Sequence, residues 1–160
     1  AHERILYERI LAQWSQKEVE VQGLLQPITI ELSPREEETL KANEGILAQF
    51  GFAIEFFGTR SYLIRTVPAL MTKANLVETL SEVLDNLASK ENPSPWEEKI
   101  AASLACHSAI RAGQQLSNDE IRELIKQLEG IHQPRTCPHG RPTMIHLSSH
   151  QLEKEFGRIS

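Results

Sequence analysis

The spacing of apolar residues predicts a mixture of helices and strands. Near the beginning, Leu6, Ile10 and Trp14 recur every four residues among charged side chains, which predicts a first helix. Residues 19–26 have only weak periodicity, so we expect a connecting segment there. Residues 27–32 alternate between apolar and polar side chains, which predicts a half-buried strand with proline at its first position.

The middle of the chain combines a capped helix, a hairpin and another helix. Residues 33–36, Ser-Pro-Arg-Glu, form a capping box with proline at the first helical position, and the helix that they begin is expected to end at Gly51. Alternation over 52–56 and 62–67 predicts two strands joined by a short loop, a β-hairpin. An apolar stripe over 76–87 predicts the next helix.

Two further helices are predicted from their capping signals. Residues 94–97, Ser-Pro-Trp-Glu, form a second capping box, and its helix is expected to continue to Cys106 and His107. Residues 117–120, Ser-Asn-Asp-Glu, form a third box, and Gly130 is expected to end that helix.

The last part of the chain begins with a loop rich in proline, histidine and arginine over 131–141. Residues 143–147 are predicted to form a strand, and a last helix is expected to begin at 148–149 with Leu152 and Phe156 on its inner side. Strands and helices do not alternate strictly, as they would in a doubly wound sheet. The sequence therefore predicts an α+β fold.

Composition agrees with an ordinary folded domain, or two small lobes that share a core. The 160 residues are 40% hydrophobic and 24% charged. Apolar runs are far shorter than the ~20 residues that span a bilayer, and no secretory signal opens the chain. A helical pattern is already present at Ala1, so we expect a piece of a longer protein. The cysteine usage favours a reducing cytoplasm.

The net charge of −5 bears on nucleic-acid binding. Phosphate backbones are bound mainly by clustered lysine and arginine, so this charge argues against a broad nucleic-acid track. We expect any contact with DNA to be local or assisted by another part of the protein.

The densest group of residues suited to chemistry lies in the proline-rich loop. Cys137 and His139 stand two residues apart in a stretch stiffened by proline and glycine, so they can face one metal ion at low ordering cost. Thiolate and imidazole are the ligands that zinc prefers. Two ligands do not complete a site, and the candidates for the others are Cys106, its neighbour His107, or a carboxylate such as Glu3.

Each of these residues also has a plainer interpretation. Cys106 alone is more typical of a packed thiol inside a helix, and Cys137 of an incidental loop thiol. Arg135 and Arg141 flank the loop pair and are candidates for binding a phosphate, whereas isolated arginines more often form surface ion pairs. The spacing alone leaves these alternatives open.

The segment from Gln22 to Pro27 contains a second feature. An extended stretch with Gln22, Leu25 and Pro27 can dock as a peptide into an apolar groove of a partner. On spacing alone, an ordinary linker is the better interpretation.

Several ordered motifs resemble those of the C-terminal domains of the MutL family of DNA mismatch-repair proteins. Residues 133–135 and 137–142 resemble the family's Q-x-R and C-P-H-G-R-P motifs, and residues 105–108 resemble its A-C-R/K/H motif. Residues 1–8 resemble the continuation of D-Q-H-A-x-x-E-x-x-x-x-E, the signature of members that nick DNA. Residues 156–158 resemble the family's F-x-R ending. The resemblance covers the length of the chain.

This resemblance implies a role for each matching residue. Glu3 corresponds to the metal-coordinating carboxylate of the nicking signature and is the implied catalytic residue. Cys106, Cys137 and His139 correspond to zinc-site ligands. Glu8 corresponds to the second glutamate of the signature. Five residues turn a helix by about 140°, so Glu3 and Glu8 cannot both point at one ion.

The resemblance also implies partners and cofactors. Gln22, Leu25 and Pro27 match the Q-x-x-[L/I]-x-P segment that binds the replication sliding clamp, and this match outweighs the linker interpretation. Zn²⁺ is expected in a structural or regulatory role and Mn²⁺ in catalysis, with ATP bound only by an N-terminal ATPase domain of the same protein. The implied partners are a second copy in a homodimer, the clamp, and duplex DNA bound weakly by this domain alone.

Two lobes are implied for the fold. Residues 1–21 and about 108–160 would form a discontinuous dimerisation lobe, and about 22–107 an inserted external, regulatory lobe. The Asp-Gln-His-Ala half of the signature is expected immediately before Ala1, and its Asp and His are expected metal ligands. Residues 1–160 are therefore expected to hold only part of the metal shell.

The implied function is a Mn²⁺-dependent endonuclease of mismatch repair in the bacterial cytoplasm, which nicks one strand of duplex DNA and is stimulated by the clamp. The alternative is a non-catalytic, zinc-stabilised module for dimerisation and partner recruitment. A zinc-binding transcriptional regulator would need a basic recognition helix, and the helix that begins at Asn118 is more acidic than basic.

Overall fold

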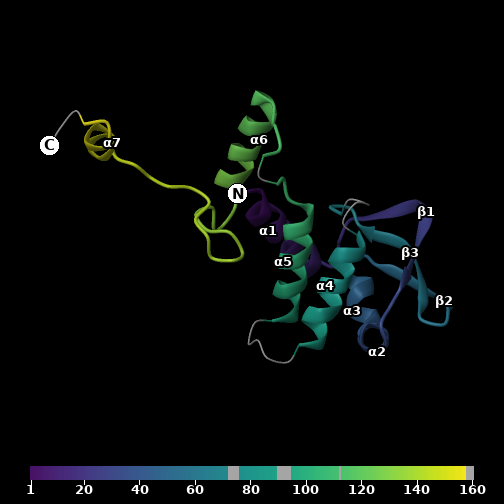
Figure 1. Cartoon of the computed structure of the whole chain (residues 1–160). Coiled ribbons are helices and arrows are strands. Elements are labelled where there is room, and N and C mark those ends of the chain that lie inside the picture. Colours follow the sequence, from purple (N-terminus) through teal and green to yellow (C-terminus); the bar gives the residue numbers. More distant parts are fainter. Residues whose placement is uncertain (72–75, 90–94, 112, 158–160) are drawn as a thin grey trace.

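The computed structural model describes residues 1–71, 76–89, 95–111 and 113–157. Their elements are α1 (His2–Ser15), β1 (Val21–Glu31), α2 (Pro34–Ala42), α3 (Glu44–Gln49), β2 (Ala53–Gly58), β3 (Ser61–Pro68), α4 (Leu76–Ala88), α5 (Trp96–Ser108), α6 (Asn118–Glu129) and α7 (Ser149–Glu155). Figure 1 shows the sheet at one side, α1 to α5 beside it, and α6 and α7 beyond them. The predicted α+β fold is confirmed, and none of the described helices has the length and apolarity to cross a membrane.

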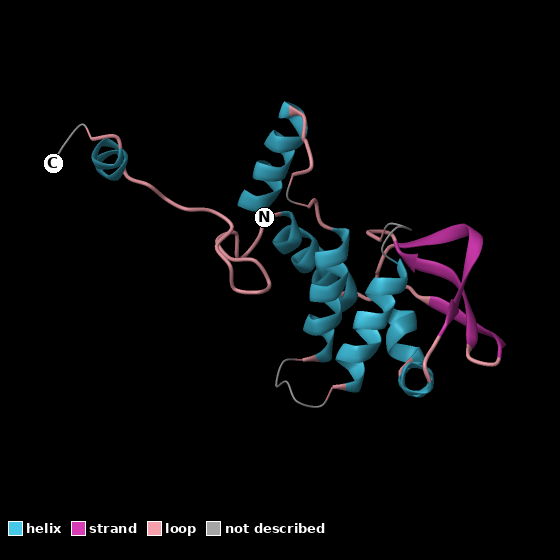
Figure 2. Cartoon of the chain, in the orientation of Figure 1, coloured by secondary structure: helices cyan, strands magenta, loops and turns pink. Residues whose placement is uncertain are grey.

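The sheet contains three antiparallel strands in the order β1-β3-β2 (Figure 2). The predicted hairpin is confirmed, because β2 and β3 pair along their length. β1 pairs with the opposite edge of β3 and forms one edge of the sheet.

β1 begins earlier than predicted. We expected a connecting segment up to residue 26, but pairing with β3 already starts at Val21. The register then shifts between Gly23 and Ile28, so residues 24–27 bulge out of the ladder. A bulge breaks the alternation of inward and outward side chains, which explains the weak periodicity of this part of the strand.

The first predicted capping box is confirmed, but the helix that it begins is divided. The hydroxyl of Ser33 accepts a bond from the backbone N–H of Glu36, whose carboxylate accepts one from the backbone N–H of Ser33. Asn43 separates α2 from α3, and its side-chain amide donates to the carbonyl of Thr39 at 2.7 Å. Such a bond competes with the helical backbone pattern. Gly51 ends the segment with a φ of 93°, as predicted.

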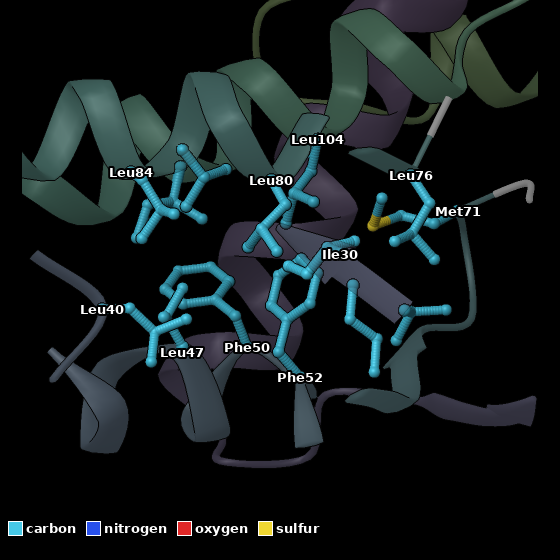
Figure 3. Close-up of a cluster of buried hydrophobic side chains, with 14 of the residues drawn as sticks. Ile30, Leu40, Leu47, Phe50, Phe52, Met71, Leu76, Leu80, Leu84 and Leu104 are labelled. Carbon is cyan, nitrogen blue, oxygen red and sulfur yellow. The ribbon is translucent and has the colours of Figure 1, made fainter. Parts of the chain in front are cut away.

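One hydrophobic cluster joins the sheet to α1, α2, α3, α4 and α5. In Figure 3, Leu80 and Leu84 of α4 face Leu40, Leu47 and Phe50 across this core. Trp14 at the end of α1 stacks on Phe50 with ring centroids 6.0 Å apart, and Trp96 at the beginning of α5 meets both rings edge-on. α1 therefore shares its core with the segment 22–107, and the division into two lobes stays a prediction.

The two later helices have different beginnings. α5 starts after Pro95, which has no side-chain capping bond, and Ser94 of the predicted box lies outside the described residues. The box of α6 is confirmed, with Ser117 and Glu120 bonded reciprocally, and Gly130 follows the helix as expected.

The predicted strand over 143–147 is wrong. No strand of the described residues lies beside this segment, and a strand without a partner leaves its backbone groups unpaired. α7 begins at the predicted place with a Ser148 capping box, but the predicted inner side of this helix is exposed. Figure 1 shows α7 at the end of an extended segment, away from the other helices. The exposed apolar side chains of this region are Met144, Ile145, Leu147, Leu152 and Phe156.

Candidate metal centre

Three potential ligands meet where the first turn of α1 contacts the loop after α6. The candidate ligand atoms of Glu3, Cys137 and His139 all lie within 4.8 Å of one another. Oε1 of Glu3 is 3.6 Å from Nδ1 of His139. The loop pair predicted from its spacing and the carboxylate implied by the resemblance are therefore close together in space.

The loop holds the Cys137 sulfur by its own backbone. Thr136 and Pro142 form an isolated antiparallel bridge, and the N–H of Cys137 donates to the carbonyl of Arg141 at 2.7 Å. Gly140 turns the chain with a φ of 79°, a backbone conformation that residues other than glycine rarely adopt. The N–H of Arg141 then donates to Sγ of Cys137 at 3.3 Å. This hydrogen bond fixes the position of the sulfur, which as a thiolate is a metal ligand.

Burial differs among the three residues. Cys137 is only 5% exposed, whereas the side chains of Glu3 and His139 are 24% and 49% exposed. The site therefore has a buried sulfur at its base and an imidazole and a carboxylate toward solvent. Carboxylate oxygen, imidazole nitrogen and thiolate sulfur are all zinc ligands in proteins, so these residues fit such an ion.

Cys106, at the end of α5, lies beside Glu3 but not within the group of three. Cys106 is an exposed residue, but neighbouring protein atoms partly shield its thiol from water. This desolvation, together with a hydrogen bond to the Glu3 carboxylate, raises the pKa of Cys106 to about 11. The thiol is thus protonated at neutral pH in this geometry. A bound cation would favour the thiolate and make the sulfur available as a ligand.

His107, an alternative ligand from the sequence, faces another partner. Its Nε2 lies 2.6 Å from a carboxylate oxygen of Glu82 on α4, and the hydroxyl of Ser103 donates to the other oxygen at 2.8 Å. This network ties α4 to α5. Of the candidates His107 and Glu3, the structure thus brings Glu3 to the loop pair.

A side chain of α1 also forms hydrogen bonds with the backbone of the loop, and the sequence did not predict this contact. The side chain of Arg4, 7% exposed, donates to the carbonyls of Thr136 and Cys137 at 2.6 and 2.9 Å. No periodicity or motif marks a buried arginine of this kind, since its partners are distant in sequence.

Glu8 has partners of its own on the same loop. Its two carboxylate oxygens accept from the N–H groups of His132 and Gln133 at 2.8 and 3.0 Å. Glu3 and Glu8 thus have different partners, in agreement with the angle between them on the helix.

The predicted clamp segment lies on the sheet, on the other side of α1 and α5 from the loop (Figure 1). Leu25, inside the β1 bulge, is 97% exposed, and Pro27 is also exposed. The side-chain amide of Gln22 donates to the carbonyl of Met71 at 2.6 Å. Two of the three residues are therefore presented to solvent, and the third is engaged within the chain.

Arg135 and Arg141 are exposed, and no ion pair of theirs is found among the described residues. They flank the buried Cys137 in the same loop. Both stay candidates for binding a phosphate.

The family model for the MutL C terminal dimerisation domain matches residues 1–116. The DNA mismatch repair protein MutL of Koribacter versatilis is 37% identical over 162 aligned residues, which cover 99% of the chain and 25% of that protein. The proteins of the same name from Azorhizobium caulinodans and Geobacter sp. are each 38% identical to the chain. Their alignments include 99% of the chain and 26% and 25%, respectively, of those proteins. The chain spans about a quarter of the length of these relatives.

Proposed function

Since the chain belongs to the MutL C-terminal dimerisation domain family, we propose that it acts in bacterial DNA mismatch repair as part of a homodimeric, cytoplasmic protein. Its proposed activity is that of a metal-dependent endonuclease that nicks one strand of duplex DNA. The observation that carries this activity is the cluster of Glu3, Cys137 and His139, whose ligand atoms lie within 4.8 Å of one another.

Glu3, Cys106, Cys137 and His139 would hold the metal. When bound, a divalent cation supplies Lewis-acid stabilisation of the phosphodiester and a water of lowered pKa, with manganese as the catalytic ion and zinc as the ordering ion. The Arg141 N–H orients the sulfur of Cys137. Glu3 provides the carboxylate oxygen, a ligand type that suits manganese better than thiolate does.

Arg135 and Arg141 would bind a DNA phosphate beside the metal ligands. Arginine pairs well with phosphate oxygens, and both side chains are exposed next to Cys137. The net charge of −5 indicates that DNA binding by this domain alone is weak. The sliding clamp and an N-terminal ATPase domain would then deliver the site to its substrate.

The clamp would bind the β1 bulge. Residues 24–27 make no ladder pairs with β3, so their backbone is available to a partner groove, and Leu25 projects fully into solvent. Gln22 would exchange its bond to the Met71 carbonyl for one to the clamp.

A second candidate function is a zinc-stabilised platform for dimerisation and partner recruitment, without nicking. A specific observation favours it: the buried Cys137 sulfur and the second thiol beside Glu3 provide the ligand types typical of structural zinc. The two candidates differ in whether phosphodiester bonds are cut.

Conversion of supercoiled plasmid to nicked circle tests the proposal. The full-length protein is incubated with plasmid, Mn²⁺ and the cognate clamp, and Glu3→Ala and Cys137→Ser are compared with the wild type. Glu18→Ala is the matched control, because this carboxylate is exposed just after α1. We expect both site variants to lose nicking and the control to keep it. An intact plasmid with the wild-type protein, together with bound zinc, would support the platform instead.

A further inference from the structure

Two charged side chains of α1 bind the backbone of the metal loop at different points. Arg4 and Glu8 are four residues apart, so they lie on the same face of the helix. Glu8 accepts from the N–H groups of His132 and Gln133, where the loop begins. Arg4 donates to the next part of the loop, the carbonyls of Thr136 and Cys137.

The two residues suit these partners chemically. An ionised carboxylate only accepts hydrogen bonds, and a guanidinium only donates them. Glu8 therefore takes two N–H groups with its two oxygens, and Arg4 takes two carbonyls with separate nitrogens. Bonds to charged groups are stronger than those between neutral groups, particularly where one partner is as buried as Arg4. The guanidinium carbon of Arg4 also lies 5.1 Å from the centroid of the Tyr7 ring, over its face. This cation–π contact further restricts the arginine side chain.

The position of these contacts relates them to the ligands. Arg4 follows Glu3 directly in α1, and its second bond is to the carbonyl of Cys137 itself. One turn of α1 thus provides a ligand and the anchor for the loop that provides the other two. Displacing the loop by a few ångströms would separate Cys137 and His139 from Glu3.

We propose that Arg4 and Glu8 are positioning residues, which hold loop 132–137 against α1 so that Cys137 and His139 face Glu3. This inference rests on the metal site of the proposed function. It assigns the second glutamate, Glu8, to the backbone of the loop and not to the metal.

The physical consequence is pre-organisation of the ligands. Without the anchors, the loop would lose its backbone freedom only when the metal binds. The entropic cost of this ordering would make the free energy of metal binding less favourable. Residues that orient metal ligands typically change metal affinity by about 10–100-fold when they are replaced.

The test measures zinc affinity by competition with a chromophoric chelator, in the full-length protein. Glu8→Ala removes both acceptors, and Arg4→Lys keeps the charge but loses the planar fork that reaches two carbonyls. We expect each to weaken zinc binding by about tenfold or more. Glu8→Gln retains one acceptor oxygen and should lose less. Glu18→Ala is the matched control and should leave the affinity unchanged.

Hydrogen exchange of the metal-free protein separates anchoring from general destabilisation. In Glu8→Ala, the amides of His132 and Gln133 should exchange faster, whereas those of α4 should not change. Zinc affinities within about twofold of the wild type for both Glu8→Ala and Arg4→Lys would overturn the inference, and so would unchanged exchange at His132 and Gln133.

Failure of the proposed metal site has a different signature. If the wild-type protein binds neither zinc nor manganese, the metal proposal fails, and the claim that these anchors position ligands falls with it. In that case, faster exchange in Glu8→Ala would still identify a structural contact, but not a positioning residue.

Discussion

Oε1 of Glu3 lies 3.6 Å from Nδ1 of His139, although one residue is in the first turn of α1 and the other is in the loop after α6. The buried Cys137 belongs to the same cluster. The thiol of Cys106, on α5, forms a hydrogen bond with the Glu3 carboxylate. Three separate parts of the chain therefore provide the candidate ligands.

The two cysteines should contribute unequally to metal binding. Cys137 is buried and belongs to the close cluster, whereas Cys106 stands beside Glu3 and has a raised pKa of about 11. We expect Cys137→Ser to lose nearly all bound zinc and Cys106→Ser to weaken affinity by a smaller factor, about tenfold. Metal content and chelator competition measure both. An equal or greater loss in Cys106→Ser would contradict this ranking.

Leu25 should be important for clamp binding and unimportant for stability. Its side chain is 97% exposed, so Leu25→Ala removes almost no packing. Loss of an interface anchor should weaken clamp binding by about tenfold or more, measured by surface plasmon resonance. Val77→Ala, at another exposed apolar position, is the control and should bind normally. Unchanged clamp affinity in Leu25→Ala would place the clamp site elsewhere.

Replacement of Leu104 should destabilise the fold without a direct effect on the ligands. This side chain is fully buried in the cluster between α5 and its neighbours. Leu104→Ala leaves a cavity and should lower the free energy of unfolding by about 2–5 kcal/mol, measured by urea denaturation. Leu25→Ala serves as the surface control. A loss below about 1 kcal/mol would show that the core is packed differently from the structure.

Stability at acid pH should depend on Glu36. Hydrogen bonds from Ser33 and Ser81 hold the pKa of this carboxyl below its ordinary value of 4.5. A folded-state pKa below the unfolded one gives stability that is present above pH 4.5 and is lost as the pH falls through the folded value. Ser81→Ala should therefore cost about 1 kcal/mol near neutral pH and progressively less below pH 4.5.

Urea denaturation across this pH range measures the difference, and Ser89→Ala is the control. The hydroxyl of Ser89 bonds to a backbone carbonyl, so its effect should not vary with pH. A constant difference between Ser81→Ala and the wild type from neutral to acid pH would contradict the assigned role of Glu36.

Local signals predicted much of the fold. The capping boxes at Ser33 and Ser117 lie within four consecutive residues each, and both form as expected. The division of the helix at Asn43 was missed because its side chain competes with the backbone, which periodicity does not register. The strand over 143–147 was predicted from its local sequence, but local sequence cannot provide the partner strand that pairing requires.

The residues of the candidate site also differ in whether local sequence could predict them. Cys137 and His139 were found from their spacing, since two ligands in one stiff loop are a local feature. Glu3 and Cys106 were only two of several candidates from the residues, and the resemblance to a family selected them, because no local pattern brings the beginning of α1 and the end of α5 to that loop. Arg4 was missed entirely, since its carbonyl partners lie more than a hundred residues away in sequence.

Zinc K-edge X-ray absorption of the full-length protein tests the central claim most directly, namely that Glu3, Cys137 and His139 hold one metal ion. The account predicts sulfur at about 2.3 Å together with nitrogen or oxygen at about 2.0–2.2 Å, and a smaller sulfur contribution in Cys137→Ser that has been loaded with excess zinc. A zinc shell without sulfur, or one that Cys137→Ser leaves unchanged, would contradict it.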